Sequence, residues 1–400
     1  MDIKKLINQE TRRQKDSITL IPSENYATKA VRSALTSVLS NKYSEGYPQK
    51  RYYPGNQICD AIERIAQENT KKAFGISDEW SVNVQPYSGS PANLAVIIGL
   101  VAPGETIMGL ALADGGHLTH GHPVSATGML FKSIQYHCDK KSGEIDYEEI
   151  ARLAEIHKPR LIISGTTSYP RAINFARIEA ISKKNDCYHL ADISHIAGLI
   201  AHQLHPNPFP HADVVVSTTH KMLRGPRGAV IIAKQNIAQR IDRAVFPGVQ
   251  GGPHNATIAA IAATMEHVQT KKFARYAKQI IANSNALAHC LIKEGFTLTT
   301  NGTDNHLMVL DMRPHNQTGA HAEQLLEKNN ILANRNSLPG DLKPFSPNGL
   351  RVGTPAVTAR GMKEKEMKLL ATLMRQSVLE KKDIRKKVAE LCNKFPIPKD

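Results

Sequence analysis

The sequence predicts an α/β protein with a mostly parallel central sheet covered by helices, followed by a smaller C-terminal α+β domain. Short apolar runs alternate with helical patterns through most of the chain, and a polar cluster follows each run. After about residue 270 the alternation ends, and a long helical pattern and three strand-like runs follow. We therefore expect a large domain over residues 1–272 and a small one over residues 273–400.

The expected strands of the large domain are short, apolar and bounded by turn residues. They cover residues 105–110, 160–165, 188–194, 212–220 and 228–234, and helical patterns cover 146–158 and 176–186. Strands that alternate with helices run parallel, and ligands bind at the carboxyl ends of such strands. In the small domain we expect one long helix over 264–295, strands within 296–300, 306–312 and 348–356, and a last helix from Lys363.

Composition and charge limit the classes of function. The 400 residues carry a net charge of +15, which favours anionic ligands. We find no RNA-recognition motif and no zinc-finger spacing, so nucleic acid is not an expected partner. The five cysteines include no CxxC pair, which is typical of a reduced, cytoplasmic protein without a zinc site. The N-terminal residues mix charges, and no apolar stretch is long enough for a membrane span.

The segment STTHKMLRGPRG, residues 217–228, brings together His220, Lys221, Arg224 and Arg227 after an apolar run. A lysine after a strand is commonly a solvated surface residue. Here it lies at the ligand-binding edge of the expected sheet, between Thr/His and Gly/Pro, which favours an amine that forms a Schiff base. The neighbouring cations either activate that amine or bind a phosphate.

Asp192 ends the apolar run YHLAD. A carboxylate in this position is a metal ligand, a catalytic partner or a helix N-cap. With a Schiff-base lysine one strand later, another role arises, because enzymes that use pyridoxal phosphate place an aspartate against the pyridinium nitrogen. His195 follows in ISHIAG, where a structural role is the alternative.

Four further segments carry candidate site residues. SGSPAN (88–93) precedes an apolar helix and predicts either a phosphate cradle or ordinary capping. GGHLTHG (115–121) supplies two histidines without a third metal ligand, and stacking on a flat cofactor is the alternative. Arg351 lies between apolar residues, which predicts either a structural ion pair or a substrate carboxylate as its partner. The Tyr- and Gly-rich segment 41–56 contains one carboxylate, Glu45.

In this order the segments resemble the serine hydroxymethyltransferase family, whose members are pyridoxal-phosphate enzymes of fold type I, the aspartate aminotransferase-like fold. The resemblance extends from LIPSENYAT near the N-terminus to NGLRVGTPAVTARG. It is carried by NKYSEGYPQKRYYPG, GGHLTHG, VVVSTTHKMLRGPRG, FPGVQGGPHN and LRVGTPA.

The resemblance implies roles for individual residues. Lys221 is similar to the lysine that binds the cofactor, and Asp192 to its pyridinium partner. Further cofactor-binding residues that it implies are Tyr43, Ser88, Gly89, Ser90, His117, Thr167, His195, Thr218, His220, Gly251 and Gly252. For the substrate it implies Ser23, Tyr53 and Arg351, for folate Leu112, Gly116, Leu118 and Asn336, and for catalysis Lys221, Glu45, His195 and His117. In the family, Tyr43, Glu45, Gly251 and Gly252 come from the partner subunit.

The implied reaction is the reversible transfer of the serine hydroxymethyl carbon to tetrahydrofolate, which gives glycine and 5,10-methylenetetrahydrofolate. The implied assembly is a homodimer with shared active sites, or a tetramer. Several positions depart from the family pattern, among them DISH for D-M-A-H, GPRGAV for GPRGG and NGLR for S-G-(I/L)-R. Thr167 stands where Ser is usual and keeps the hydroxyl, and Ala256 stands where His is common, which leaves the assembly open.

Two other classes of function compete with this interpretation. A folate-free aldolase of the same fold would cleave β-hydroxy amino acids, but the residues Leu112, Leu118 and Asn336 argue against it. A basic RNA-binding protein that kept the fold would not need the catalytic residues, all of which are present.

Overall fold

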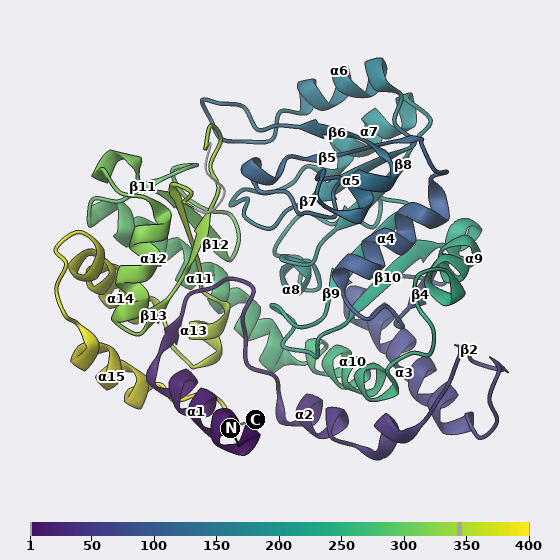
Figure 1. Cartoon of the computed structure of the whole chain (residues 1–400), viewed down its shortest axis with the longest axis horizontal. Helices are drawn as coiled ribbons and strands as arrows, with labels where there is room; N and C mark the ends of the chain where they lie inside the picture. Colours follow the sequence, from purple (N-terminus) through teal and green to yellow (C-terminus); the bar gives the residue numbers. More distant parts are fainter. Residues whose placement is uncertain (1, 342–345, 400) are drawn as a thin grey trace. The chain divides into compact units, whose positions relative to one another are not determined.

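The computed structural model describes residues 2–341 and 346–399, which form two compact units (Figure 1). One unit comprises Met1–Tyr26, Ser168–Arg171 and Lys278–Lys399, and we call it the terminal unit. The other comprises Ala27–Thr167 and Ala172–Ala277, and we call it the sheet unit. Each unit is described separately below.

The sheet unit is built on a seven-stranded sheet with the order β4-β10-β9-β8-β7-β5-β6. Strand β10 runs antiparallel to both its neighbours, and the other pairings are parallel. The strands are β4 (Trp80–Asn83), β5 (Thr106–Leu110), β6 (Lys132–Tyr136), β7 (Leu161–Gly165), β8 (Tyr188–Asp192), β9 (Val214–Thr218) and β10 (Ala229–Lys234). All five residues of β9 are buried, because both faces of the sheet are covered.

Helices cover this sheet. Apolar residues lie all around α4 (Gly89–Leu100), which packs against β9 and β10 and also against α9 (Gln235–Arg243). The other helices of the unit are α2 (Lys29–Leu35), α3 (Gln57–Phe74), α5 (Ala126–Leu130), α6 (Tyr147–His157), α7 (Phe175–Lys184), α8 (Ala197–Ile200) and α10 (Asn255–Val268), with the short turns η1 (Val38–Asn41), η2 (Leu112–Asp114) and η3 (Ala244–Val249).

The five strands and two helices predicted for the large domain are confirmed. The strands are β5 and β7 to β10, and the helices are α6 and α7. The prediction missed β4 and β6. Both strands lie at the edges of the sheet, and the sequence of β6, KSIQY, carries polar residues at three of its positions. Such a strand lacks the continuous apolar run that marks a strand buried on both faces.

The terminal unit contains a four-stranded antiparallel sheet with the order β11-β12-β15-β14. Its strands are β11 (Thr297–Leu298), β12 (Leu307–Asp311), β14 (Asn334–Asn336) and β15 (Gly349–Gly353), and β1 (Ile18–Thr19) pairs in parallel with β13 (Ile331–Leu332). The helices are α1 (Ile3–Asp16), α11 (Lys271–Lys293, in which the boundary between the units falls), α12 (Gly319–Lys328), α13 (Pro355–Ala359), α14 (Glu364–Val378) and α15 (Arg385–Lys394), with the turn η4 (Arg313–His315).

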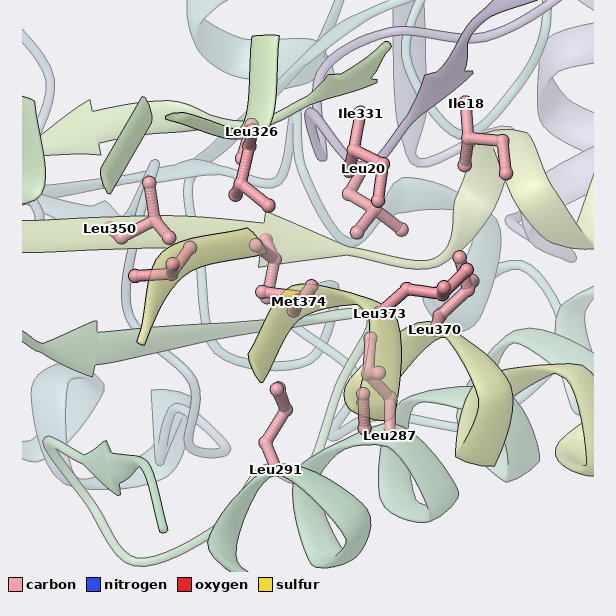
Figure 2. Close-up of a cluster of buried hydrophobic side chains, with 14 of the residues drawn as sticks. Ile18, Leu20, Leu287, Leu291, Leu326, Ile331, Leu350, Leu370, Leu373 and Met374 are labelled. Atoms are coloured by element: carbon pink, nitrogen blue, oxygen red, sulfur yellow. The ribbon is translucent and has the colours of Figure 1, made fainter. Parts of the chain in front are cut away.

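One apolar core holds the terminal unit together (Figure 2). Ile18 and Leu20, from the N-terminal part of the chain, are fully buried in it. They lie among side chains of α11, α12, α14 and β15 such as Leu287, Leu326 and Leu370. Parallel pairing of Ile18 with Ile331 fixes their register.

The single long helix expected over residues 264–295 is wrong. Two helices occupy this stretch, because α10 ends at Val268 and α11 begins at Lys271. The amide of Thr270 still donates to the carbonyl of His267, and its hydroxyl accepts from the Phe273 amide in the first turn of α11. A threonine in this position is a typical helix N-cap, which the periodic apolar pattern hides.

Within residues 2–341 and 346–399, no helix is both long enough and apolar enough to cross a membrane.

We expect Ile18→Ala to lower the free energy of unfolding by about 2–5 kcal/mol, because it leaves a cavity in this core. Ile3→Ala is the matched control, since Ile3 lies in the same N-terminal segment and is 69% exposed. Its effect should stay within about 0.5 kcal/mol. Urea denaturation measures both, and equal effects of the two substitutions would contradict the burial of the N-terminal strand.

Candidate active site

The carboxyl ends of β7, β8 and β9 bring the predicted site residues of the sheet unit together. Gly165 ends β7 opposite Asp192, which ends β8. A side chain at Gly165 would lie 2.1 Å from the Asp192 carbonyl oxygen, and its φ of +120° also favours glycine. Thr218 ends β9, and its amide donates to the Ser194 hydroxyl at 3.0 Å. The expected clustering at one edge of the sheet is therefore present for these segments.

Asp192 is a buried carboxylate with several polar partners. Its Oδ2 accepts a hydrogen bond from Asn93 Nδ2 at 2.9 Å and lies 3.1 Å from His120 Nε2. Its Oδ1 accepts from the Ser194 amide at 3.0 Å. Burial alone would raise the pKa of Asp192, but the contact with His120, the nearby His117 and the hydrogen bond from Ser194 together outweigh it and hold this pKa well below its ordinary value. Asp192 is therefore ionised and can pair with a cationic ring nitrogen.

His117 lies beside this carboxylate and is linked to it through Thr119. His117 Nδ1 is 2.7 Å from Thr119 Oγ1, which also accepts from Asn93 Nδ2 at 2.9 Å. Burial lowers the pKa of His117 to about 4, and the neighbouring His120 and Lys221 act in the same direction. The imidazole is therefore neutral near pH 7, which suits stacking on a flat aromatic ring.

Lys221 follows β9, and its amine lies at the same sheet edge. Its Nζ donates to Thr218 Oγ1 at 2.9 Å. The chain turns back directly after it, since the Arg224 amide donates to the Lys221 carbonyl at 3.1 Å and Thr219 Oγ1 donates to the Pro226 carbonyl at 2.7 Å. This turn keeps the Lys221 amine in contact with Thr218, the last residue of β9.

The other cations of this segment have different surroundings. Burial, together with the nearby charges of Lys221 and Arg227, lowers the pKa of His220 to about 3, so His220 is a neutral hydrogen-bonding group at pH 7. Arg227 is exposed. Arg224 is buried, and its guanidinium carbon lies 5.8 Å from the ring centre of Tyr276. It therefore packs in the interior rather than facing solvent.

The segment Ser88–Gly89–Ser90 lies next to Thr218. Helix α4 begins at Gly89, and the Ser88 side chain makes no capping hydrogen bond to it. A side chain at Gly89 would lie 2.7 Å from Thr218 Cγ2, so only glycine allows the two segments this close. The free amides of this helix start therefore lie beside the lysine-bearing strand end, as a phosphate cradle requires.

A second cluster in the sheet unit contains five of the predicted residues. Tyr43 donates a hydrogen bond to Glu45 Oε1 at 3.2 Å, and its ring centre is 4.8 Å from that of Tyr53. Glu45 Oε1 also lies 3.3 Å from the position that a Gly251 side chain would take, and the Tyr43 ring 3.3 Å from that of Gly252. The Glu45 carboxylate raises the pKa of Tyr43, so this hydroxyl remains a donor.

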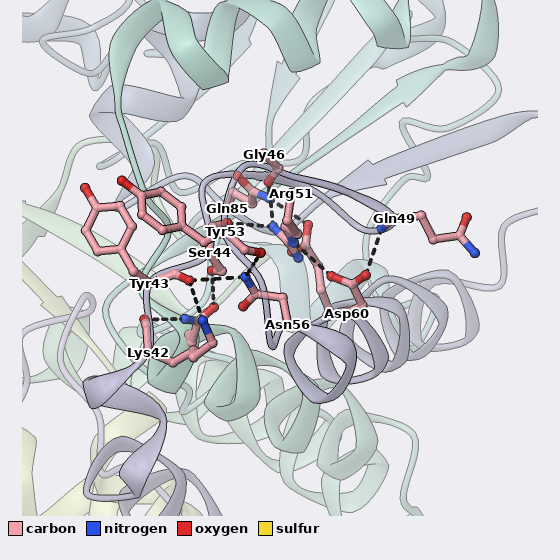
Figure 3. Close-up of polar contacts among 12 residues, drawn as sticks. Lys42, Tyr43, Ser44, Gly46, Gln49, Arg51, Tyr53, Asn56, Asp60 and Gln85 are labelled. Atoms are coloured by element: carbon pink, nitrogen blue, oxygen red, sulfur yellow. Dashed lines mark hydrogen bonds and ion pairs between the residues drawn. The ribbon is translucent and has the colours of Figure 1, made fainter.

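Arg51 lies close to this cluster and is the last residue of β3 (Lys50–Arg51), which pairs with β2 (Gly46–Tyr47) (Figure 3). Its side chain is 4% exposed and pairs with Asp60 at 2.8 Å and Glu63 at 2.5 Å, both on α3. Gln85 Nε2 also donates to Glu63, at 2.8 Å. The network thus ties the hairpin to α3.

The same guanidinium also fixes the backbone around Glu45. Arg51 Nη1 donates to the carbonyl oxygens of Ser44 at 2.9 Å and Gly46 at 2.5 Å, the residues on either side of Glu45 (Figure 3). The backbone on both sides of Glu45, the proposed acid–base residue, is therefore fixed by a buried cation that does not contact the Glu45 carboxylate.

The expected folate contacts of the sheet unit lie in the turn that follows β5. Leu112 is half-buried, and Leu118 is 42% exposed. Thr167 Oγ1 donates to the Gly116 carbonyl at 2.9 Å, so its hydroxyl binds this turn.

Arg351, Ser23 and Asn336 belong to the terminal unit. Arg351 lies on β15 and is 9% exposed, and its Nε donates to Asn334 Oδ1 at 3.1 Å. Burial lowers the pKa of Arg351 to about 10, a value at which the guanidinium stays charged near pH 7. Ser23 is half-buried, and Asn336 Nδ2 donates to the Ser337 carbonyl at 2.7 Å.

Sequence reasoning assigned no role to several residues that hold the site. Asn93 and Ser194 bind Asp192 directly, and His120 was considered only as a metal ligand or a stacking group. The sequence contained an indication for Asn93, because this polar residue directly precedes the apolar run LAVIIGL in the predicted helix. The structure shows that Asn93 is buried. Tyr87 gave no such signal, and its hydroxyl donates to the Gly252 carbonyl at 2.7 Å. His195, which was predicted, is buried just beyond β8.

No group of three or more His, Cys, Asp or Glu side chains in the described part of the chain is arranged to hold a metal ion.

Comparison with known proteins gives one consistent result. Residues 1–374 match the family model described as serine hydroxymethyltransferase. The chain is 50% identical over 404 aligned positions to the serine hydroxymethyltransferase of Sorangium cellulosum, covering 99% of this chain and 95% of that protein. It is 48% identical to the protein of the same name from Desulfotalea psychrophila, covering 99% and 94% of the two chains. With that of Acidothermus cellulolyticus it shares 47% identity, covering 98% and 94%.

We expect Arg51→Met to lower the free energy of unfolding by about 3–5 kcal/mol, because it leaves Glu63 buried without its cation. Arg64→Met is the control, since Arg64 is an exposed residue of the same helix, α3, as Glu63. Urea denaturation compares the two variants. If Arg51→Met is as stable as Arg64→Met, the buried network does not hold the Glu45 hairpin.

Proposed function

The chain belongs to the serine hydroxymethyltransferase family, and from this membership we propose which of its residues carry out the reaction. The protein is an enzyme that transfers the hydroxymethyl carbon of serine reversibly to tetrahydrofolate, giving glycine and 5,10-methylenetetrahydrofolate. The observation that supports the assignments best is the meeting of Lys221, Asp192 and the Ser88–Ser90 segment at one edge of the sheet unit, linked through Thr218 and Ser194.

We propose pyridoxal 5′-phosphate as the cofactor, and the surroundings of the sheet edge fit it. The ionised Asp192 suits a protonated ring nitrogen, and the neutral His117 suits stacking on the ring. The helix start at Gly89, together with Ser88, Ser90 and His220, suits the phosphate. When bound, pyridoxal phosphate stabilises negative charge at the amino-acid Cα. Lys221 supplies the amine that holds the cofactor, and Thr218 orients this amine.

The other proposed roles belong to binding and proton transfer. Arg351 binds the serine carboxylate with its guanidinium fork, and Ser23 and Tyr53 also contact the substrate. Glu45 accepts or donates the proton of the hydroxyl group, in a position fixed by Tyr43 and the Arg51 network. His195 and Thr167 contact the cofactor, as do Tyr43, Gly251 and Gly252. Leu112, Gly116, Leu118 and Asn336 contact tetrahydrofolate.

We propose a homodimer in which Tyr43, Glu45, Gly251 and Gly252 complete the partner's site. Large apolar side chains that are exposed in the single chain support this, because they lie close to the Glu45 hairpin in the sequence: Val38 is 80% exposed, Tyr52 75% and Ile58 70%. Exposed apolar groups of this size mark a protein–protein surface.

The finer architectural and cellular expectations stay predictions. These are fold type I with a boundary between residues 272 and 273, the absence of a resident metal, and a cytoplasmic location.

We expect Lys221→Ala to lose the visible absorbance band of the bound cofactor and to lower serine turnover by on the order of a thousandfold or more. Lys234→Ala, which removes a lysine paired with Asp213, is the control and should keep both. Retention of the band by Lys221→Ala would refute the assignment. Serine cleavage that tetrahydrofolate does not stimulate would instead point to the folate-free aldolase.

We expect Arg351→Met to lower kcat/KM for serine, mainly by raising KM, because a charge-assisted pair with the carboxylate is lost. The decrease corresponds to a loss of on the order of 2–5 kcal/mol in transition-state stabilisation. Arg335→Met is the matched control, since Arg335 lies on the neighbouring strand β14, has a side chain that is 42% exposed, and pairs with Glu323. Steady-state kinetics with serine measure both. A similar KM in the two variants would show that Arg351 does not bind the substrate.

A further inference from the structure

The turn between β5 and His117 carries two of the proposed folate contacts. Within it, the Asp114 amide donates to the Ala111 carbonyl at 3.0 Å and the Gly115 amide to the Leu112 carbonyl at 3.1 Å. The turn consists of the three-residue 3₁₀ turn η2, closed by Gly115 in a left-handed conformation with φ of 101°. The Gly116 amide donates to the Ala111 carbonyl at 3.0 Å. Because 3₁₀ turns have poor hydrogen-bond geometry, their position depends on contacts with neighbouring segments.

Asp114 links this turn to the end of β6. Its carboxylate is 4% exposed, and Oδ2 lies 2.8 Å from Nδ1 of His137. The amide of Cys138 donates to Oδ1 at 3.2 Å. The backbone of His137 is itself held, since its amide donates to Glu149 Oε2 at 2.6 Å and its carbonyl accepts from the Asp146 amide at 3.2 Å. The buried carboxylate is thus held by one strand end.

Thr167 holds the other side of the same turn. Its amide donates to the Gly115 carbonyl at 2.7 Å, and its hydroxyl to the Gly116 carbonyl at 2.9 Å. The turn also has little space to move toward β5, because a side chain at Gly116 would lie 1.9 Å from the Leu110 carbonyl oxygen. Asp114 therefore completes a set of contacts that determines where Leu112 and Gly116 lie.

We propose that Asp114 and His137 are positioning residues for the folate-binding turn. This inference rests on the proposed function of Leu112 and Gly116 and adds two residues that touch neither folate nor the cofactor. Without the imidazole, the buried carboxylate keeps the Cys138 amide but loses a charge-assisted partner, so it draws in water and moves the turn. The loss then falls on folate binding and not on serine binding.

The test is His137→Ala, because the imidazole is 55% exposed and its removal leaves no cavity in a core. We expect KM for tetrahydrofolate to rise roughly tenfold, which corresponds to about 1.4 kcal/mol. KM for serine and the spectral change on adding glycine should stay unchanged. His137→Asn retains an N–H donor near the position of Nδ1 and should restore most of the folate affinity.

The matched control is His211→Ala. It removes another histidine–carboxylate contact of the sheet unit, between His211 Nδ1 and Glu179 Oε2 at 2.6 Å, and should leave KM for tetrahydrofolate unchanged. The inference is overturned if His137→Ala leaves KM for tetrahydrofolate unchanged or raises KM for serine equally. It is also overturned if KM for tetrahydrofolate is as high in His137→Asn as in His137→Ala. A wild-type enzyme whose serine turnover does not respond to tetrahydrofolate would instead overturn the proposed function.

Discussion

The buried charge of Asp192 is the interaction on which the cofactor side of the site depends. An unpaired carboxylate in an apolar interior costs several kcal/mol, so its partners must be in place when the chain folds. These partners come from separate parts of the sheet unit: Asn93 from α4, His120 from the segment after β5, and Ser194 from the chain after β8. Satisfying one carboxylate therefore fixes the relative positions of three segments, each of which carries a proposed cofactor contact: Ser90 on α4, His117 after β5 and His195 after β8.

Arg51 acts in the same way for the Glu45 hairpin. A guanidinium has five N–H donors in a fixed plane, and here they are shared between two carboxylates of α3 and the carbonyls on both sides of Glu45. In both clusters, a buried charged group fixes the segments that carry proposed site residues. Asp114 extends this pattern to the folate-binding turn.

The sequence was sufficient for features that depend on neighbours along the chain. Apolar runs predicted the buried strands, and polar residues at their ends located Asp192 and Lys221. Contacts between distant segments gave no such signal: Asp114 and His137 are 23 positions apart, and nothing in either segment indicates the contact. The polar edge strand β6 and the break between α10 and α11 were missed for a related reason, since periodicity responds to burial and not to strand pairing or capping.

Close backbone approaches set the tolerance of the site to substitution. At Gly89, Gly165 and Gly116, an added side chain would lie 2.7, 2.1 and 1.9 Å from Thr218, Asp192 and Leu110, respectively. The last two contacts are with carbonyl oxygens, which cannot rotate away as a side chain can. The Lys221 side chain takes part in none of these close approaches. It follows that truncating Lys221 removes chemistry and leaves the geometry, whereas a methyl group at Gly165 or Gly116 displaces the strand ends themselves.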